Sequence, residues 1–131
     1  MERTRPSVVF LDTHIIVWLY DALLSKFSPN AQSIMENGDL KISPMSILEL
    51  QYLYEIKRIN VKPKTILHHL EVTLDLKNDE THFSNVIAEA MSFTWTRDPF
   101  DRIIVAQAKC NKAYLVTADQ VIQDHYSLSV I

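Results

Sequence analysis

Short apolar blocks alternate with helical patterns along the chain. Residues 7–11 (SVVFL) are apolar at successive positions and rich in β-branched side chains, which is typical of a strand buried on both faces of a parallel sheet. Further strands are expected at 40–43, 113–117 and 127–131, with a short one at 74–76. Helical patterns lie between them, at 13–24, 28–38, 43–59, 63–74, 79–93, 99–110 and 119–126.

One helix carries clear start and stop signals. Ser28 fits the N-cap, Pro29 the first helical position and Gly38 the position past the end. Strands separated by helices favour a parallel sheet with helices on both faces. The sequence therefore predicts an α/β sandwich.

The 131 residues suit one domain spanning 1–131, and a composition that is 47% hydrophobic and 22% charged is globular. The lone cysteine, Cys110, excludes an internal disulfide, so we expect a cytoplasmic protein. No apolar run reaches the roughly 18 residues of a membrane span, so no membrane association is expected. The charged start is followed by an apolar run that stops at Asp12, unlike a signal peptide.

The formal charge of −3 argues weakly against nucleic-acid binding. If four carboxylates form a metal site, however, the remaining surface carries a charge of +1. Net charge therefore leaves the nature of the partner open.

Four acids follow strands of the predicted sheet at its carboxyl edge. Asp12 and Asp119 come just after strands, and Glu49 and Asp101 lie in the first turns of helices. Functional groups of parallel sheets gather at this edge. Each pair of carboxylates at ~4 Å would repel by about 4 kcal/mol at an effective dielectric near 20. A divalent cation reverses the sign, and oxygen ligands suit Mg²⁺ or Mn²⁺.

Each acid also has a purely structural interpretation. Asp12 and Asp119 suit helix N-caps, and Glu49 fits a capping box with Ser46. Asp98 fits the cap of the helix that Pro99 begins, and Asp101 favours its dipole. Capping alone explains any one of these acids more easily than it explains all of them at one edge.

Other catalytic chemistry has little support. Cys110 lies inside a predicted helix without a histidine partner, and the adjacent His68 and His69 face different sides of a helix. A glycine-rich phosphate loop is impossible because Gly38 is the single glycine.

The chain contains four characteristic blocks, in the order VVFLDTHIIVWL, ISPMSILEL, RDPFDRIIVAQA and LVTAD. Together they resemble the motifs of PIN-domain proteins, and most of all those of the VapC-type toxins of bacterial toxin–antitoxin pairs. The resemblance runs from about Val8 to the C-terminal SLSVI. The combination of DPFDR, AQA and TAD is more specific than any block alone. CNKA replaces the usual glycine before LVT, and Thr96 stands where histidine is common.

The resemblance implies a PIN-like α/β/α sandwich with a central, mostly parallel sheet of four to five strands. It also implies a Mg²⁺- or Mn²⁺-dependent ribonuclease that leaves 5′-phosphate and 3′-hydroxyl ends. Partners would be the RNA substrate, a cognate antitoxin and a second copy in a homodimer. The residues it assigns as catalytic and metal-binding are Asp12, Glu49, Asp101 and Asp119, with Asp98 and Thr117 as accessory residues.

Basic residues suggest where RNA would be held. Cations cluster after the helix bearing Glu49, and two arginines flank the later acids; the candidates are Lys57, Arg58, Lys62, Lys64, Arg97 and Arg102. The alternatives are a solvated helix end for the cluster and ion pairs with Asp98 and its neighbours for the arginines. His14, beside Asp12, is expected to be packed or hydrogen-bonded rather than catalytic.

Two other functions remain open. An aspartyl phosphatase on an α/β sheet would want a second acid two residues after Asp12, where His14 stands. A non-catalytic or receiver-like module would not need all four acids, and a receiver would want a lysine after a late strand, where LVTAD has none.

Overall fold

The computed structural model describes residues 7–131. The charged start of the chain, on which the expectation of no signal peptide rests, lies outside the described residues. The strands are β1 (Val8–Leu11), β2 (Asp39–Ile42), β3 (Lys77–Asn78), β4 (Tyr114–Val116) and β5 (Ser129–Val130). The helices are α1 (Thr13–Tyr20), the 3₁₀ turn η1 (Leu24–Lys26), α2 (Pro29–Asn37), α3 (Pro44–Glu55), α4 (Pro63–Leu74), α5 (Phe83–Ala90), α6 (Pro99–Cys110) and α7 (Gln120–His125).

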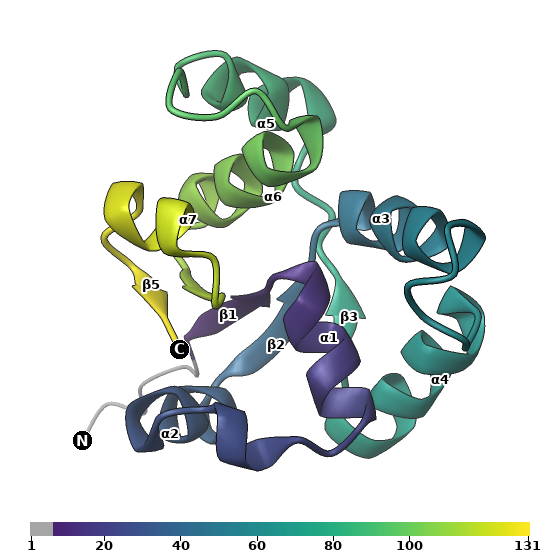
Figure 1. Cartoon of the computed structure of the whole chain (residues 1–131). Helices are drawn as coiled ribbons and strands as arrows, with labels where there is room; N and C mark the ends of the chain where they lie inside the picture. The colour runs from purple at the N-terminus through teal and green to yellow at the C-terminus, as the bar shows by residue number, and fades with distance from the viewer. Residues whose placement is uncertain (1–6) are drawn as a thin grey trace.

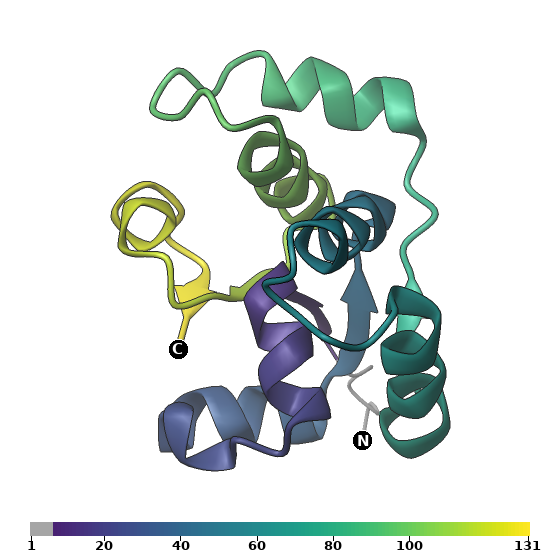
Figure 2. The ribbon, with the colours of Figure 1, turned by 45° about the vertical axis from the view of Figure 1, so that its right-hand side comes forward.

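The strands form one parallel sheet in the order β3-β2-β1-β4-β5, with β1 at its centre (Figure 1). Side chains alternate across it: Val9 and Leu11 pack with α1 to α4, whereas Phe10 packs with α5 to α7. Figure 2 shows the helices on either side of the sheet. The predicted α/β/α sandwich is confirmed.

The predicted start of α2 is confirmed in detail. Ser28 Oγ accepts a hydrogen bond from the Ala31 N–H, and Pro29 is the first helical residue. Gly38 follows the helix with φ −112°, which any residue adopts. A Cβ there would meet the Val9 side chain and lie 2.8 Å from the Ser7 carbonyl oxygen. Gly38 is therefore needed for space and not for a left-handed conformation.

Two helices end earlier than predicted. α1 stops at Tyr20, not near Leu24, because Ala22 is left-handed (φ 57°) and the Leu23 N–H donates back to the Trp18 carbonyl. This is a Schellman ending.

α3 ends in the same way at Glu55, four residues before the predicted end. Lys57 is left-handed (φ 63°) and the Arg58 N–H donates to the Leu53 carbonyl. Such endings usually carry glycine, so these two gave no signal in the sequence.

The short strand predicted at 74–76 is wrong by a few positions. Leu74 belongs to the last turn of α4, and Asp75 is its left-handed C-cap. The strand β3 begins only at Lys77, after Leu76 has entered the core.

None of the helices in residues 7–131 combines the length and apolar composition required to cross a bilayer.

Candidate active site

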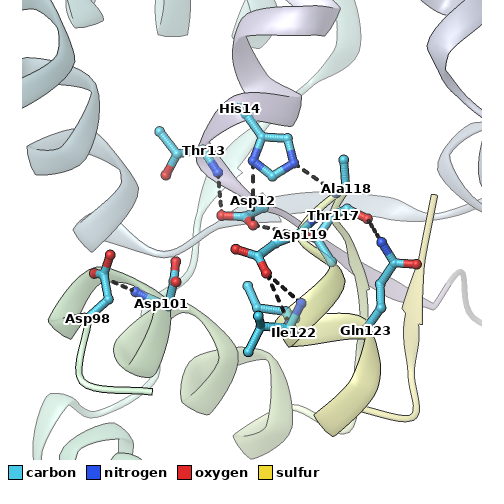
Figure 3. Close-up of polar contacts among 11 residues, drawn as sticks. Asp12, Thr13, His14, Asp98, Asp101, Thr117, Ala118, Asp119, Ile122 and Gln123 are labelled. Atoms are coloured by element: carbon cyan, nitrogen blue, oxygen red, sulfur yellow. Dashed lines mark hydrogen bonds and ion pairs between the residues drawn. The ribbon is translucent and has the colours of Figure 1, made fainter. Parts of the chain in front are cut away.

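Two of the predicted acids lie side by side because their strands are neighbours. Leu11 at the end of β1 is in register with Val116 at the end of β4, and the Asp12 N–H donates to the Val116 carbonyl at 3.0 Å. Asp12 caps α1, and Asp119 caps α7 two residues beyond Thr117. The end of β1 therefore meets the turn after β4 (Figure 3).

Asp12 is held by contacts on both carboxylate oxygens. Its Oδ1 accepts a hydrogen bond from the Thr13 N–H at 2.8 Å, and its Oδ2 accepts one from Thr117 Oγ1 at 2.7 Å. The side chain is almost fully buried. Burial raises the pKa of Asp12 and the Asp119 charge adds to it, although His14, Thr117 and the Thr13 N–H act in the opposite direction.

Thr117 links two of the acids. Its hydroxyl donates to Asp12 and accepts a hydrogen bond from the Asp119 N–H at 3.1 Å. Asp119 Oδ1 in turn accepts from the N–H groups of Val121 and Ile122 at 2.8 and 3.2 Å. The cap uses one carboxylate oxygen, so Oδ2 of Asp119 remains for other contacts.

Glu49 reaches the site from α3. The capping box with Ser46 is wrong, because α3 begins at Pro44 and its N-cap is Ser43. Burial raises the pKa of Glu49, the nearby Thr13 hydroxyl opposes this, and the charges of Asp12 and Asp98 raise it further. Thr13 Oγ1 is buried and makes no hydrogen bond of ordinary geometry to the described residues.

Asp98 and Asp101 have different roles at the start of α6. Asp98 Oδ1 accepts hydrogen bonds from the N–H groups of Phe100 and Asp101 at 2.8 and 3.3 Å, so the predicted cap is confirmed. The Asp101 carboxylate does not cap. The pKa of Asp101 is raised to about 7 by burial and by the charges of Asp98, Asp12, Asp119 and Glu49.

Asp12, Asp101 and Asp119 lie near one another at the carboxyl edge of the sheet (Figure 3), and Glu49 reaches the same region from α3. Asp12 and Asp119 are caps as well, so the structural interpretation of these two is also correct. In the described part of the chain, no group of three or more His, Cys, Asp or Glu side chains is arranged so that it could hold a metal ion.

The donors available fit a hard cation. They are carboxylate oxygens together with the buried Thr13 hydroxyl, which makes no hydrogen bond of ordinary geometry within residues 7–131. Mg²⁺ is commonly held by one or two carboxylates with its remaining positions filled by water. An open, oxygen-only site of this kind suits Mg²⁺ or Mn²⁺ better than a softer metal.

The basic candidates are not all placed beside the acids. All four residues of the cluster are exposed. Lys57 and Arg58 follow the C-terminal end of α3, away from Glu49, whereas Lys62 and Lys64 line a pocket with Pro44, Ile47, Leu48 and Gln51 of α3. Arg102 donates from Nε and Nη2 to the Ala90 carbonyl at 3.3 and 3.0 Å, which ties α6 to α5. Arg97 is exposed next to Asp98.

Sequence reasoning did not anticipate the contacts of His14 and Thr13. The Ala118 N–H donates to His14 Nε2 at 2.8 Å, and His14 Nδ1 lies 3.6 Å from Asp12 Oδ2. The expectation that His14 is hydrogen-bonded is confirmed, but its partner is 104 positions away. The only local signal for either residue is its place directly after Asp12.

Comparison with known structures reveals the same fold in toxin–antitoxin complexes. VapBC2 from Rickettsia felis, bound to a DNA fragment from its promoter, has a TM-score of 0.62 at 18% identity, over 94% of this chain and 96% of that chain. A toxin–antitoxin complex from Klebsiella pneumoniae gives 0.63 at 14% identity, with the same shares covered. VapBC-1 from nontypeable Haemophilus influenzae gives 0.55 at 17% identity, over 89% and 93%.

At these identities the likeness concerns the fold. No curated protein sequence matches the chain. The sequence profile described as PIN domain, however, matches residues 9–127, which is nearly the whole chain. The match includes all four acids and the elements that carry them. The chain therefore belongs to the PIN domain family.

Proposed function

We propose that this PIN-domain protein is a metal-dependent ribonuclease that acts as the toxin of a toxin–antitoxin pair. The observation that supports this most is the convergence of Asp12, Glu49, Asp101 and Asp119. Burial and the charges of Asp98, Asp12, Asp119 and Glu49 raise the pKa of Asp101 to about 7. Groups with strongly shifted pKa values often mark functional sites. Acids placed so unfavourably are consistent with a site completed by a cation.

The four acids would hold Mg²⁺ or Mn²⁺. The chemistry supplied by such an ion is charge neutralisation at the phosphodiester and acidification of the attacking water. The protein contributes position. Thr117 and the Thr13 N–H fix both oxygens of Asp12, and the cap hydrogen bonds of Asp98 and Asp119 fix the starts of α6 and α7.

The substrate would be RNA, cut to leave 5′-phosphate and 3′-hydroxyl ends. Arg97 is the basic candidate best placed for a phosphate contact, because it is exposed and adjacent to Asp98. Of the exposed cluster, Lys57 and Arg58 would contact RNA further from the cut, whereas Lys62 and Lys64 lie beside the first turns of α3. Arg102 is engaged with α5 and serves the fold.

The proposed partners follow from the structures that share the fold. Three of them are described as VapBC or toxin–antitoxin complexes. We infer a cognate antitoxin for this chain, a homodimer as the working form and the cytoplasm as its location. A short reading frame beside the gene whose product suppresses toxicity would support the antitoxin.

The direct test is cleavage of labelled single-stranded RNA with Mg²⁺, with Mn²⁺ and with EDTA. Asp12→Asn and Asp101→Asn should abolish cleavage and keep the circular dichroism spectrum. Asp21→Asn is the matched control, because Asp21 is an exposed carboxylate at the other end of α1. Full activity of Asp101→Asn, or cleavage in EDTA, would contradict the proposal.

A phosphatase is the second candidate. Hydrolysis of a phosphomonoester such as p-nitrophenyl phosphate, without cleavage of RNA, would favour it. The position two residues after Asp12 argues against it, because His14 there is bonded to Ala118 and supplies no second carboxylate. Absence of both activities would favour a non-catalytic module.

A further inference from the structure

Two aromatic rings form an exposed pair at the border of the acidic site. Tyr52 of α3 and Phe100 of α6 are stacked, with ring centroids 6.1 Å apart and planes 28° from parallel. Phe100 is half-buried and packs against the core beneath α6. Tyr52 remains 49% exposed. The pair is thus a ring open to solvent with a second ring anchored behind it.

Each of the two helices that carry the aromatic rings also carries acids of the site. Tyr52 follows Glu49 by three residues, and residues at this spacing share one face of a helix. Phe100 stands between Asp98 and Asp101 at the start of α6. α3 and α6 are in direct contact, and the stacked rings of Tyr52 and Phe100 are part of that contact. The aromatic pair therefore lies where α3 and α6 meet, on the rim of the acids.

We propose that Tyr52, supported by Phe100, is a stacking platform for an unpaired base of the RNA next to the cleaved phosphodiester. This inference rests on the proposed function and adds a substrate-binding residue to it. Single-stranded RNA is commonly held by stacking of its bases on aromatic side chains, whatever the base. A carboxylate-rich site repels phosphates, so an uncharged base contact beside it offsets that repulsion.

The exposed neighbours of Tyr52 define the competing interpretation. Leu48 and Ile56 lie one turn to either side on α3 and are 55% and 44% exposed. A protein partner seated along α3 would contact all three side chains. A base requires Tyr52 alone, and Tyr52 alone of the three stacks on a ring attached beside Asp101. The observations favour RNA.

The test combines substitution of the protein with removal of the base. Tyr52→Ala should raise KM for a short single-stranded RNA by roughly tenfold with kcat nearly unchanged, whereas Tyr52→Trp and Tyr52→Phe keep the platform. Leu48→Ala is the matched control and should leave KM unchanged. Binding of the same labelled RNA to Asp101→Asn protein, with and without Tyr52→Ala, should show the same loss without cleavage. Thermal melting checks that each variant is folded.

A series of RNAs with one abasic nucleotide identifies the contact. At one position near the cut, loss of the base should weaken binding to the parent protein and have no further effect on Tyr52→Ala. The platform is wrong if Tyr52→Ala binds the RNA as tightly as the parent protein. It is also wrong if the substitution weakens binding by the same factor for every abasic RNA. Equal losses in Leu48→Ala, Ile56→Ala and Tyr52→Ala would instead indicate a general docking face and overturn it. If the parent protein neither binds nor cleaves RNA, the proposed function fails and the platform with it.

Discussion

His14 Nε2 accepts a hydrogen bond from the backbone N–H of Ala118 at 2.8 Å, which ties the first turn of α1 to the turn after β4. A backbone N–H can only donate, so Nε2 carries no proton and the ring proton lies on Nδ1. Nδ1 faces Asp12 Oδ2 at 3.6 Å (Figure 3), and the ring meets Trp18 edge-on. One imidazole therefore sets the relative position of the segments that bear Asp12 and Asp119.

Replacing this ring should weaken metal binding more than it weakens the fold. His14→Phe keeps the packing on Trp18 but loses both polar contacts, and loss of such a supporting contact typically costs 10- to 100-fold in metal affinity. His14→Gln can still accept a hydrogen bond from the Ala118 N–H, so its metal affinity should lie between those of the wild-type protein and His14→Phe. Isothermal titration with Mn²⁺ measures the affinity. Equal Mn²⁺ affinities of His14→Phe and the wild-type protein would show that the His14 ring contributes packing alone.

The stability of the metal-free protein should fall as pH rises. Because the pKa of Asp101 is about 7 when folded and near 3.8 when unfolded, its contribution is fully present below pH 3.8 and is lost as pH passes 7. Asp101→Asn should therefore stabilise the protein at pH 8 by about 1 to 2 kcal/mol after solvent screening, and hardly at pH 4. Urea unfolding in EDTA at the two pH values measures the difference. An equal effect of the substitution at both would refute the shifted pKa.

Metal binding should show the opposite pH dependence. Carboxylates must lose their protons to bind a cation, so Mn²⁺ affinity should rise between pH 6 and 8 and binding should release protons. Calorimetry in buffers of different ionisation enthalpy detects that release. Asp119→Asn keeps a good N-cap but lowers affinity, whereas Asp119→Ala should also lower the stability of the apoprotein by about 1 kcal/mol. An affinity that does not change with pH would contradict the prediction.

Asp79 should matter for folding and not for catalysis. Its buried carboxylate accepts hydrogen bonds from the Thr81 N–H at 3.0 Å and Gln107 Nε2 at 2.8 Å, with Lys41 Nζ at 3.8 Å. Burial raises the pKa of Asp79, but the hydrogen bonds and Lys41 outweigh it and lower the pKa overall.

Asp79→Ala should cost about 3 kcal/mol of unfolding free energy, because Gln107 is left buried without its partner. The metal affinity of the folded protein should stay unchanged. The exposed neighbour Glu80 provides the control, Glu80→Ala. A loss of stability no larger than that of the control would rule out the network as a stabilising feature.

The order of elements and the edge that carries the acids could be predicted because both have local signals. An apolar block marks β1, and Asp12 follows it directly; Pro99 marks the start of α6. Contacts across the fold leave no such pattern. Gln107 meets Asp79 from 28 positions away, and His14 meets Ala118 from 104. The site was predictable as a set of acids, whereas the hydrogen bonds that hold them were not.

The ends of α1 and α3 also escaped prediction, and they share one physical property. The residues that turn the chain there, Ala22 and Lys57, are left-handed without being glycine. Asp75 and Lys112, which follow the correctly predicted ends of α4 and α6, are left-handed as well, and the four φ values run from 49° to 63°. A side chain in that conformation costs about 1 kcal/mol relative to glycine. Meanwhile Gly38, the single glycine of the chain, occupies a position where close packing requires it.

The stability of the fold can therefore be increased by substitutions at turns outside the acidic site. Ala22→Gly and Lys112→Gly relieve backbone strain at exposed turns and should each raise the unfolding free energy by up to about 1 kcal/mol. Gly38→Ala should lower it. Denaturant midpoints measure all three changes. Combined with Asp101→Asn, which should abolish the proposed nuclease activity, the two stabilising changes would give a more stable protein for studies of metal and RNA binding.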